Sequence, residues 1–517
     1  MTPYASEHIL VMSMERGSTE RDSAVRKMSE TTVALPRSRG WPPALRIESD
    51  TLTLDGYDLA ALAHERGTPL WAISRSTVED NFRELTSAFK ARYPRCEFAY
   101  SIKAHNTLAV VRVLYQAGAK LDCSAEYEFQ LALRAGVSPG DIILNGNGKS
   151  DAALRSAVEL GIRQVNVDSV DEVDRLQTLA SAADRTIPCL VRVQLTYDRL
   201  LDLDPSFETT LRIGEGKFGS NLANGQALET IRAVLAASNL TFLGLSHHVG
   251  FSGYMGDYSR ERELMHHREC TREVCELANV LHETEGCAVE RLDLGGGFRS
   301  GDSVLLSTPG AGADVDFHNL PQPSEYAEAI FGVLEETLET PERPLVQFES
   351  GGYQIANAVV MLATISEVKD IPGPGARRYV VIDGSMMMFV SRGMMRVGHP
   401  VVAVSKPLAD PAREWPVEVV GQTCVYDSVA EDIRLPPVAR GDVLALLNQG
   451  AYCETESTQF NAFPRPEVVM LDRGQAFVVK RRETIDDIHA RDVIPNELVE
   501  GSLDAFPLST SKAGGEK

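Results

Sequence analysis

Short runs of apolar residues alternate with amphipathic stretches through the middle of the chain. Eight runs have the length of strands buried on both faces, and most are followed by apolar residues at helical spacing. This alternation predicts an all-parallel sheet closed into a (β/α)8 TIM-type barrel, with a doubly wound open sheet as the alternative. The predicted strands are residues 97–102, 120–124, 142–146, 164–167, 189–193, 242–247, 291–294 and 346–349, and the predicted helices include 152–161, 169–180, 225–237 and 258–285.

The pattern changes after residue 360, where Val-rich runs are separated by Pro and Gly. Such runs predict an all-β domain, a sandwich or barrel. Its expected strands are 379–383, 417–420, 443–448 and 476–480. We divide the chain into a flexible leader (1–40), a strand and helix contribution to the β domain (41–69), the barrel (70–360, opening with a buried strand at 70–73), the β domain (361–506) and a flexible tail (507–517).

Composition narrows the classes of function. The 517 residues include 51 Lys and Arg against 73 Asp and Glu, so the net charge of −22 disfavours nucleic acids and anionic membranes as partners. No apolar run approaches the roughly 20 residues of a membrane span, and no signal-peptide pattern is present, so we expect a cytoplasmic protein. Eight cysteines without paired spacing indicate reduced thiols rather than disulfides or a metal site.

Residue types suited to catalysis follow several predicted strands, at the end where barrels gather their active sites. Lys103 ends the first of the eight strands, although a solvated lysine is an alternative interpretation. Gly295, Gly296 and Gly297 follow another strand. Consecutive glycines leave backbone N–H groups free to surround an anion, and a tight turn is the alternative.

Two further strands end in histidine and glutamate. No partner stands at the spacing of a zinc helix beside His247 and His248, so we expect no metal site there. We expect the His248 ring to stack on a planar ligand and Ser252 to reach a phosphate, with ordinary packing as the alternative. Glu349 can fix the protonation of a bound heterocycle, or serve only in an ion pair.

The β region adds Cys424 and Tyr452, although a free cysteine is more often inert packing than a catalyst. A lysine for a Schiff base, a glycine loop for a phosphate, a stacking histidine and a carboxylate for a ring nitrogen are the requirements of pyridoxal phosphate. No single motif is specific, but their combination in this order predicts a pyridoxal-phosphate site.

From about residue 45 to 500 the sequence resembles the fold-type III pyridoxal-phosphate decarboxylases, the group of ornithine, arginine and diaminopimelate decarboxylases, whose barrel is shared with alanine racemase. The segment Tyr-Ser-Ile-Lys-Ala-His at 100–105 is similar to the family's Tyr-Ala-Val-Lys-Ala-Asn. The other matching positions are Asp122-Cys123, Glu128, 145–150, Asp168-Ser169, Lys217-Phe218-Gly219, 248–250, 295–298, Asp383-Gly384, Cys424, 450–452 and 460–463.

The resemblance implies a role for each candidate. Lys103 would form the Schiff base with pyridoxal phosphate, His248 would stack on its ring and Glu349 would bond the ring nitrogen. Its phosphate would be held by Ser252, Gly295, Gly296, Gly297 and Tyr452. The family is dimeric with active sites shared across the interface, so Cys424 would enter from the partner chain of a homodimer. There it would protonate the carbon that has lost carbon dioxide.

The sequence departs from the family pattern near the expected substrate. Gly352 replaces the arginine of the family's Glu-Pro-Gly-Arg, and Val425 replaces an acidic residue that reads a distal amine. Asp427 is a candidate substitute for that acid, and Arg392 and Arg396 are candidates for contact with a second carboxylate. These changes argue against the usual diamino substrates without altering the chemistry of the cofactor.

We therefore expect an amino-acid decarboxylase with the fold of the diaminopimelate type. Two alternatives remain. An amino-acid racemase shares the lysine and the cofactor, but the long β domain and Cys424 argue against it. A non-catalytic binding protein is the other, and the presence of Lys103, Glu349, Cys424 and Tyr452 argues against that.

Overall fold

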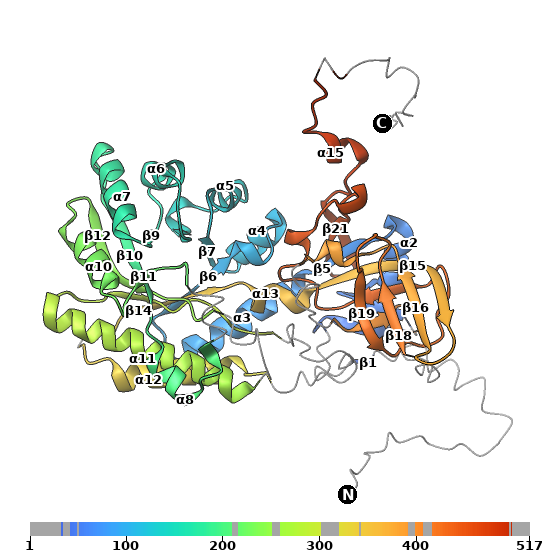
Figure 1. Cartoon of the computed structure of the whole chain (residues 1–517), viewed down its shortest axis with the longest axis horizontal. Coiled ribbons are helices and arrows are strands. Elements are labelled where there is room, and N and C mark those ends of the chain that lie inside the picture. The colour runs from blue at the N-terminus through green and yellow to red at the C-terminus, as the bar shows by residue number, and fades with distance from the viewer. Residues whose placement is uncertain are drawn as a thin grey trace, which may run out of the picture.

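Two lobes make up the molecule, a helix-rich barrel and a β-rich domain (Figure 1). The computed structural model describes residues 42–48, 51–208, 216–250, 259–300, 320–340, 343–390, 399–406, 416–495 and 498, and the backbone of Val33–Ala34. Ser252, Arg392 and Arg396 lie outside this described part. Within it, no helix is long and apolar enough to cross a membrane.

The first lobe is the predicted closed barrel of eight parallel strands. Neighbouring strands pair in chain order, β10 pairs with both β9 and β12, and β14 pairs with β6 to close the ring. The two-residue strand β11 (Ser220–Asn221) extends the edge of β10. All eight predicted barrel strands are confirmed: β6 (Cys96–Ser101), β7 (Lys120–Cys123), β8 (Ile142–Leu144), β9 (Gln164–Val167), β10 (Ile187–Gln194), β12 (Leu240–Ser246), β13 (Arg291–Asp293) and β14 (Leu345–Ser350).

Helices surround the barrel, and serine caps begin several of them. Ser150, Ser169 and Ser259 each accept a hydrogen bond from a backbone N–H of the first turn, which satisfies a donor that the helix leaves unpaired. The four predicted helices are confirmed as α6, α7, α10 and α11. The barrel helices are α3 (Arg75–Arg92), α4 (Leu108–Gln116), α5 (Glu126–Arg134), α6 (Asp151–Leu160), α7 (Val170–Ala182), α8 (Asp198–Leu203), α10 (Gln226–Ala236), α11 (Arg260–Glu285), α12 (Pro323–Thr337) and α13 (Gly352–Ile355).

An aromatic cluster fixes the part of the barrel that carries the glycine loop. The ring of Phe89 lies 5.1 Å from Phe98, 5.3 Å from Phe298 and 4.9 Å from Phe348, edge to face in each case. Edge-to-face contacts of this kind add to the burial of apolar area. Because Phe298 directly follows Gly297, this packing sets where the glycine loop leaves β13.

The second lobe contains a nine-stranded sheet, and four of its strands match the expected ones. These are β16 (Arg377–Ile382), β18 (Val417–Val420), β20 (Val443–Leu446) and β22 (Gln475–Lys480). Four strands were not predicted, namely β15, whose second half is polar and exposed, and β17, β19 and β21. The remaining strands are β5 (Leu70–Ser74), β15 (Val359–Ile371), β17 (Val401–Ala403), β19 (Ser428–Ile433) and β21 (Glu467–Asp472).

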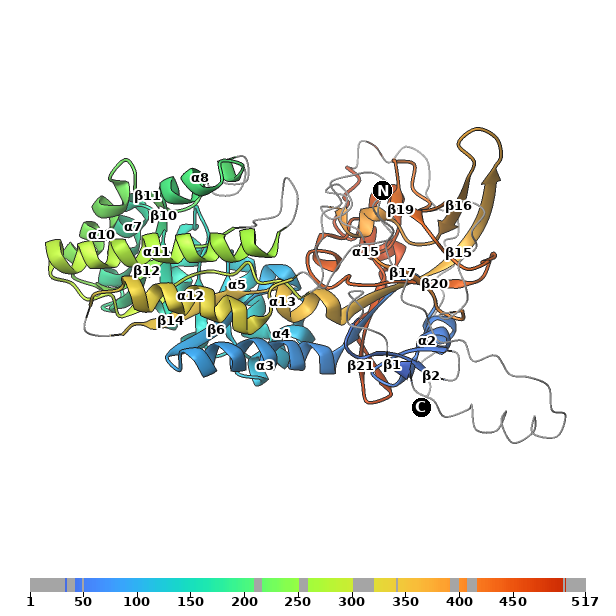
Figure 2. The ribbon, with the colours of Figure 1, turned by 90° about the horizontal axis from the view of Figure 1, so that it is seen from below.

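One expected boundary is wrong. The strand at residue 70 does not open the barrel, because β5 pairs antiparallel with β15 and parallel with β21 in the β domain. Every residue of β5 is buried, so its pattern resembles that of a barrel strand. The chain then passes through α3 into the barrel and returns through α13 and β15 (Figure 2).

A small sheet completes the β domain, as expected for the region before the barrel. It is formed by β1 (Val33–Ala34), β2 (Leu45–Glu48), β3 (Thr51–Leu54) and β4 (Tyr57–Asp58), followed by α2 (Leu59–Arg66). The leader is thus not wholly without structure, since β1 pairs with β2. Leu45, Ile47 and Leu52 pack in a core with Val360 and Leu362 of β15.

Candidate active site

Lys103 lies on a short 3-10 turn, η3 (Ile102–Ala104), directly after β6. Burial disfavours its charged amine, but the interactions of the amine with Asp122, Tyr452 and Glu349 outweigh this and raise the pKa of Lys103. The lysine is therefore protonated at neutral pH. These interactions also show that groups from β7, β14 and the β domain converge on one amine.

The glycine loop lies against two other predicted site residues. Gly295 has a φ of +69°, and a Cβ there would lie 2.6 Å from the Cα of His248. A Cβ on Gly296 would collide with the carbonyl oxygen of Glu349, whose backbone N–H donates to the Gly295 oxygen at 2.8 Å. Only glycine permits this approach. The structure thus brings the loop, His248 and Glu349 together.

His248 is held as a neutral ring. The backbone N–H of Gly250 donates to its Nδ1 at 2.8 Å, which assigns the ring proton to Nε2. Burial lowers the pKa of His248 well below its ordinary value, and the positive charges of Lys103 and Arg192 add to the effect. A neutral half-buried ring at this position is suited to packing on a planar ligand.

Glu349 lies buried among other carboxylates. The amides of Asn145 and Asn166 donate to its Oε1, the latter at 3.4 Å. Burial, with the charges of Asp122 and Asp293, raises the pKa of Glu349 well above its ordinary value. The pKa of Asp293 is raised too, mainly by burial. Without a cation beside it Glu349 therefore tends to hold a proton, and a cationic N–H placed against it would favour its ionised form.

Tyr452 approaches the same place from the β domain. Its backbone N–H donates to the carbonyl of Ala104 at 2.9 Å, so the loop that carries Tyr452 rests on the turn that carries Lys103. The backbone of Tyr452 has a φ of +58°, a left-handed conformation uncommon for a residue with a side chain.

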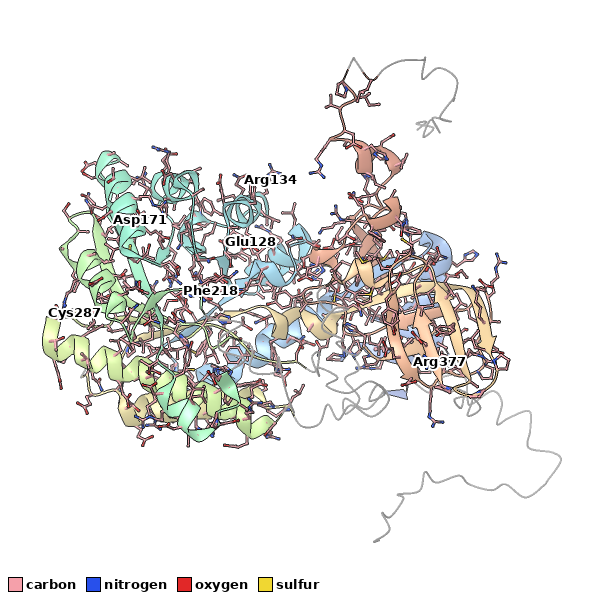
Figure 3. The ribbon with its side chains drawn as sticks, viewed as in Figure 1. Glu128, Arg134, Asp171, Phe218, Cys287 and Arg377 are labelled. Atoms are coloured by element: carbon pink, nitrogen blue, oxygen red, sulfur yellow. The ribbon has the colours of Figure 1, made fainter. Side chains whose placement is uncertain are left out.

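Arg192 was not predicted as a site residue from the sequence. It lies in β10, is only 9% exposed, and its guanidinium carbon is 4.5 Å from the centroid of the Phe218 ring. Figure 3 labels Phe218 within the outline of the barrel lobe, and its side chain is half-buried. The charge of Arg192 acts on Lys103, His248 and Glu349, which places it beside the site. The sequence did contain a signal for this role, because Arg192 is a charged residue within an otherwise apolar predicted strand.

Asp122 was matched as part of a motif but given no role. It is fully buried, and accepts from Ser101 Oγ at 2.8 Å and from the Asn145 amide at 3.3 Å. These bonds orient a carboxylate whose charge reaches both Lys103 and Glu349. Asp122 therefore supports the charge state of the site.

Cys424 is placed differently from the barrel residues. It is the exposed one of the eight cysteines, and its backbone N–H donates to Asn461 Oδ1 at 3.1 Å. The next two residues, Val425 and Tyr426, are 38% and 69% exposed. The loop thus presents its thiol and apolar side chains at the surface of the β domain.

Asp427 has a different part from the substrate contact suggested by its sequence position. Its carboxylate is buried and accepts from the backbone N–H of Met386 at 2.7 Å, from Ser385 Oγ at 2.8 Å, and from both the N–H and the hydroxyl of Thr423. A carboxylate so fully occupied holds its own loop. We therefore assign Asp427 to the positioning of the Cys424 loop.

Comparison with known proteins gives one family. The model for the pyridoxal-binding domain of pyridoxal-dependent decarboxylases matches residues 78–356. The chain is 29% identical over 454 residues to the diaminopimelate decarboxylase of Methanothermobacter thermautotrophicus, covering 87% of this chain and 97% of that protein. It is 32% identical over 458 residues to the diaminopimelate decarboxylase of Actinosynnema pretiosum, covering 88% and 95%.

A solved structure is similar over nearly the same length. The diaminopimelate decarboxylase from Methanocaldococcus jannaschii, crystallised with L-lysine, superimposes with a TM-score of 0.77 at 26% identity. The match covers 89% of this chain and 99% of that one.

Proposed function

The chain belongs to the pyridoxal-dependent decarboxylases, and we propose that it removes the α-carboxylate of an amino acid at the barrel end where Lys103 lies. The observation that carries the proposal is the convergence there of Lys103, His248, Glu349 and the glycine loop. Each type of group that pyridoxal phosphate requires is present within that one region.

The residues fit pyridoxal phosphate on structural grounds. The glycine loop approaches His248 and Glu349 more closely than any side chain would permit. The Gly295 N–H donates to Asp293 Oδ1 at 3.0 Å, so the N–H groups of Gly296 and Gly297 are the ones we propose for the phosphate. The carboxylate of Glu349 lies in negative, buried surroundings that a protonated ring nitrogen would offset. When bound, the cofactor supplies an electron-accepting ring that stabilises the charge released as carbon dioxide leaves.

The chain's own residues bind, orient and move protons around that ring. Lys103 would be the point of covalent attachment, and its raised pKa means that Nζ has to lose a proton before it acts as a nucleophile. His248 would pack on the ring face, and Glu349 would keep the ring nitrogen protonated. The glycine loop, Ser252 and Tyr452 would hold the phosphate.

We assign the return of a proton to Cα to Cys424, supplied by the partner chain of a homodimer. Cys424 lies on an exposed loop with Val425 and Tyr426, and a thiol can act as a general acid only where it meets substrate. A twofold dimer that packs this loop on the partner's barrel would bury the apolar side chains and deliver the thiol together.

The substrate we propose is an amino acid with a second carboxylate. Val425 cannot pair with a distal ammonium, and Asp427 is occupied within its own loop. Arg392 and Arg396 are the candidates for contact with the second carboxylate. The free cysteines fit a reducing compartment, and we place the enzyme in the cytoplasm.

The test is incubation of the purified protein and pyridoxal phosphate with amino acids in deuterated water, followed by mass spectrometry. The panel is diaminopimelate, ornithine, lysine, arginine and glutamate, in both enantiomers where these exist. A product that has lost carbon dioxide and gained deuterium at Cα is the expected result. Deuterium uptake without carbon loss would establish a racemase instead, and a colourless protein that binds no pyridoxal phosphate would establish a non-catalytic binder.

A further inference from the structure

One segment of the β domain, residues 452–465, touches two parts of the proposed site. At its start, the backbone N–H of Tyr452 donates to Ala104 in the turn that carries Lys103. Near its end, Asn461 accepts the backbone N–H of Cys424. We call this stretch the connecting segment. Whatever fixes its two ends also fixes the positions of Tyr452 and Cys424.

The Tyr452 end is held by the last residue of β22. Lys480 Nζ donates to both carboxylate oxygens of Glu454, at 2.9 and 2.7 Å, and to Asn106 Oδ1 at 3.2 Å. Glu454 is buried, and Asn106 lies three residues after Lys103. One ammonium group therefore joins the connecting segment to the loop that follows Lys103. Charge-assisted bonds that are partly buried hold such geometry well.

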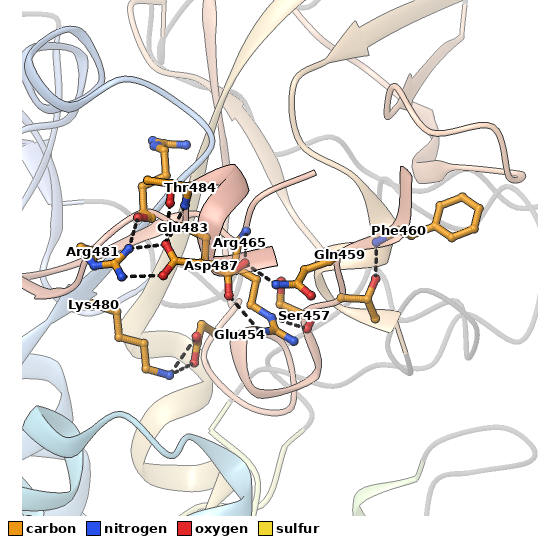
Figure 4. A network of polar contacts seen from close by, with 12 residues as sticks. Glu454, Ser457, Gln459, Phe460, Arg465, Lys480, Arg481, Glu483, Thr484 and Asp487 are labelled. Carbon is orange, nitrogen blue, oxygen red and sulfur yellow. Dashed lines mark hydrogen bonds and ion pairs between the residues drawn. The ribbon is translucent and has the colours of Figure 1, made fainter. Parts of the chain in front are cut away.

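The Cys424 end is held by Glu483, three residues beyond β22. Its carboxylate accepts from the Gln459 amide at 2.9 Å, and from the backbone N–H and guanidinium of Arg465 at 2.9 and 3.1 Å. Burial opposes the charge, but these donors outweigh it and lower the pKa of Glu483. Gln459 and Arg465 lie on either side of Asn461. Figure 4 shows the bonds between Lys480 and Glu454 and those that Glu483 accepts. Lys480 and Glu483 are three residues apart in the sequence.

We propose that Lys480 and Glu483 are positioning residues for the two parts of the site, Lys480 for Tyr452 and Glu483 for Cys424. The proposal rests on the proposed function for the roles of Tyr452 and Cys424. Neither Lys480 nor Glu483 acts on substrate or cofactor, and each works through the connecting segment. Because the two residues hold different ends, their loss has different consequences.

Lys480→Met removes the charge at the Tyr452 end while keeping an unbranched side chain. We expect the dissociation constant for pyridoxal 5'-phosphate to rise by about tenfold, the effect of one lost charge-assisted bond. Hydrogen exchange at the Tyr452 amide, measured by mass spectrometry, should rise with it, and exchange across residues 420–428 should not. Lys480→Arg, which restores a donor, should recover most of the affinity.

Lys406→Met is the matched control for this change. Lys406 also pairs with a carboxylate of the β domain, Asp442 at 2.9 Å, with similar exposure. It should leave cofactor affinity and exchange at Tyr452 unchanged. If Lys480→Met destabilises the fold, Asn106→Ala removes only the bond to the Lys103 chain and should weaken cofactor binding in the same direction. If these variants bind cofactor as Lys406→Met does, the proposal for Lys480 is wrong.

Glu483→Gln should produce the opposite pattern. It replaces one acceptor oxygen by an NH2 group, so Arg465 loses at least one of its two bonds, and Gln459 loses its own when Oε2 is the atom replaced. We expect exchange across residues 420–428 to rise by about tenfold with the cofactor dissociation constant unchanged. Glu467→Gln is the control, because Glu467 pairs with Arg66 in the same domain at 2.7 Å. Equal exchange in the two variants would overturn the proposal for Glu483.

These measurements separate the positioning proposal from the proposed function. Exchange at the two ends of the connecting segment needs no substrate, so it tests the roles of Lys480 and Glu483 directly. If the wild type bound no pyridoxal phosphate, or if Cys424→Ala left rate and product unchanged, the proposed function would fail. The exchange pattern would still decide the positioning roles.

Discussion

We assign the barrel end and the Cys424 loop to the same active site. Within a single chain, the two regions differ in how far their side chains are buried. At the barrel end, Lys103, His248 and Glu349 are partly or fully buried, and their pKa values are shifted by burial and by one another. The Cys424 loop is exposed and carries Tyr426 at its surface. The barrel end is thus organised for a ligand, whereas the loop is exposed in a single chain and, in the proposed homodimer, would be completed by the partner.

Hydrogen bonds within the β domain nevertheless fix the Cys424 loop. The buried carboxylate of Asp427 fixes one side of it, and Asn461 fixes the backbone at Cys424. An exposed loop with so many internal bonds is stiff rather than free. This combination suits a group that is delivered, already oriented, to a partner chain.

The largest expected effect comes from a substitution at the barrel end. Lys103→Ala should lower kcat by on the order of 10³–10⁴-fold, because it removes the amine that we propose as the point of covalent attachment. The absorbance band that the bound cofactor gives near the visible range should disappear as well. Lys369→Ala, which changes an exposed lysine of β15, is the control and should retain full activity. A Lys103→Ala protein with near-normal turnover would contradict the assignment.

The next prediction tests whether the Lys103 and the Cys424 of one active site belong to different chains. Cys424→Ala should lower kcat by on the order of 10²-fold. If sites are shared across a homodimer, mixing inactive Lys103→Ala with Cys424→Ala should restore up to about a quarter of wild-type activity, since half of the dimers are mixed and each has one intact site. Activity measured after mixing and re-equilibration gives the answer. Absence of recovery would place Cys424 in the site of its own chain.

Glu349→Gln sharpens the comparison through pH. The raised pKa of Glu349 means that the folded, cofactor-free protein keeps a proton that the unfolded chain loses near pH 4.5. The resulting stability is present below pH 4.5 and is lost as the pH rises through the raised pKa. Thermal unfolding of the cofactor-free protein should therefore decline with pH less steeply in Glu349→Gln than in wild type. Parallel declines would show that Glu349 is not the group responsible.

The smallest effect concerns His105, which replaces the family's asparagine. Burial lowers its pKa to about 4, and neither ring nitrogen has a hydrogen-bond partner among the described residues. Because the folded pKa lies below the ordinary 6.5, stability is lost as the pH falls from 6.5 through 4. His105→Asn should recover on the order of 2–3 kcal/mol at pH 4, measured by denaturant unfolding. No difference between pH 7 and pH 4 would refute this.

The barrel was predictable because its strands are short apolar runs that alternate with amphipathic helices. Once those strands were placed, the rule that catalytic groups follow their C-terminal ends brought Lys103, the glycine loop, His248 and Glu349 to one place. Pairing partners were not predictable in the same way. The strand β5 is as buried as a barrel strand, and only its bonds to β15 and β21 assign it to the β domain.

Side-chain roles inside the site depended on tertiary contacts. Arg192 stands in an apolar strand, and its effect on Lys103 and Glu349 follows from which strands are neighbours in the closed barrel. The occupation of Asp427 by donors from residues 385, 386 and 423 likewise follows from loops that meet only in the fold. The roles of Lys480 and Glu483 have the same origin, since their partners lie elsewhere in the chain.

The central claim is that Lys103 carries pyridoxal phosphate at the end of the barrel. Its most direct test is reduction of the cofactor-loaded protein with borohydride, followed by proteolysis and mass spectrometry of the labelled peptide. We predict a single phosphopyridoxyl group on Lys103. An unlabelled Lys103, or a label at another lysine such as Lys217, would contradict the claim.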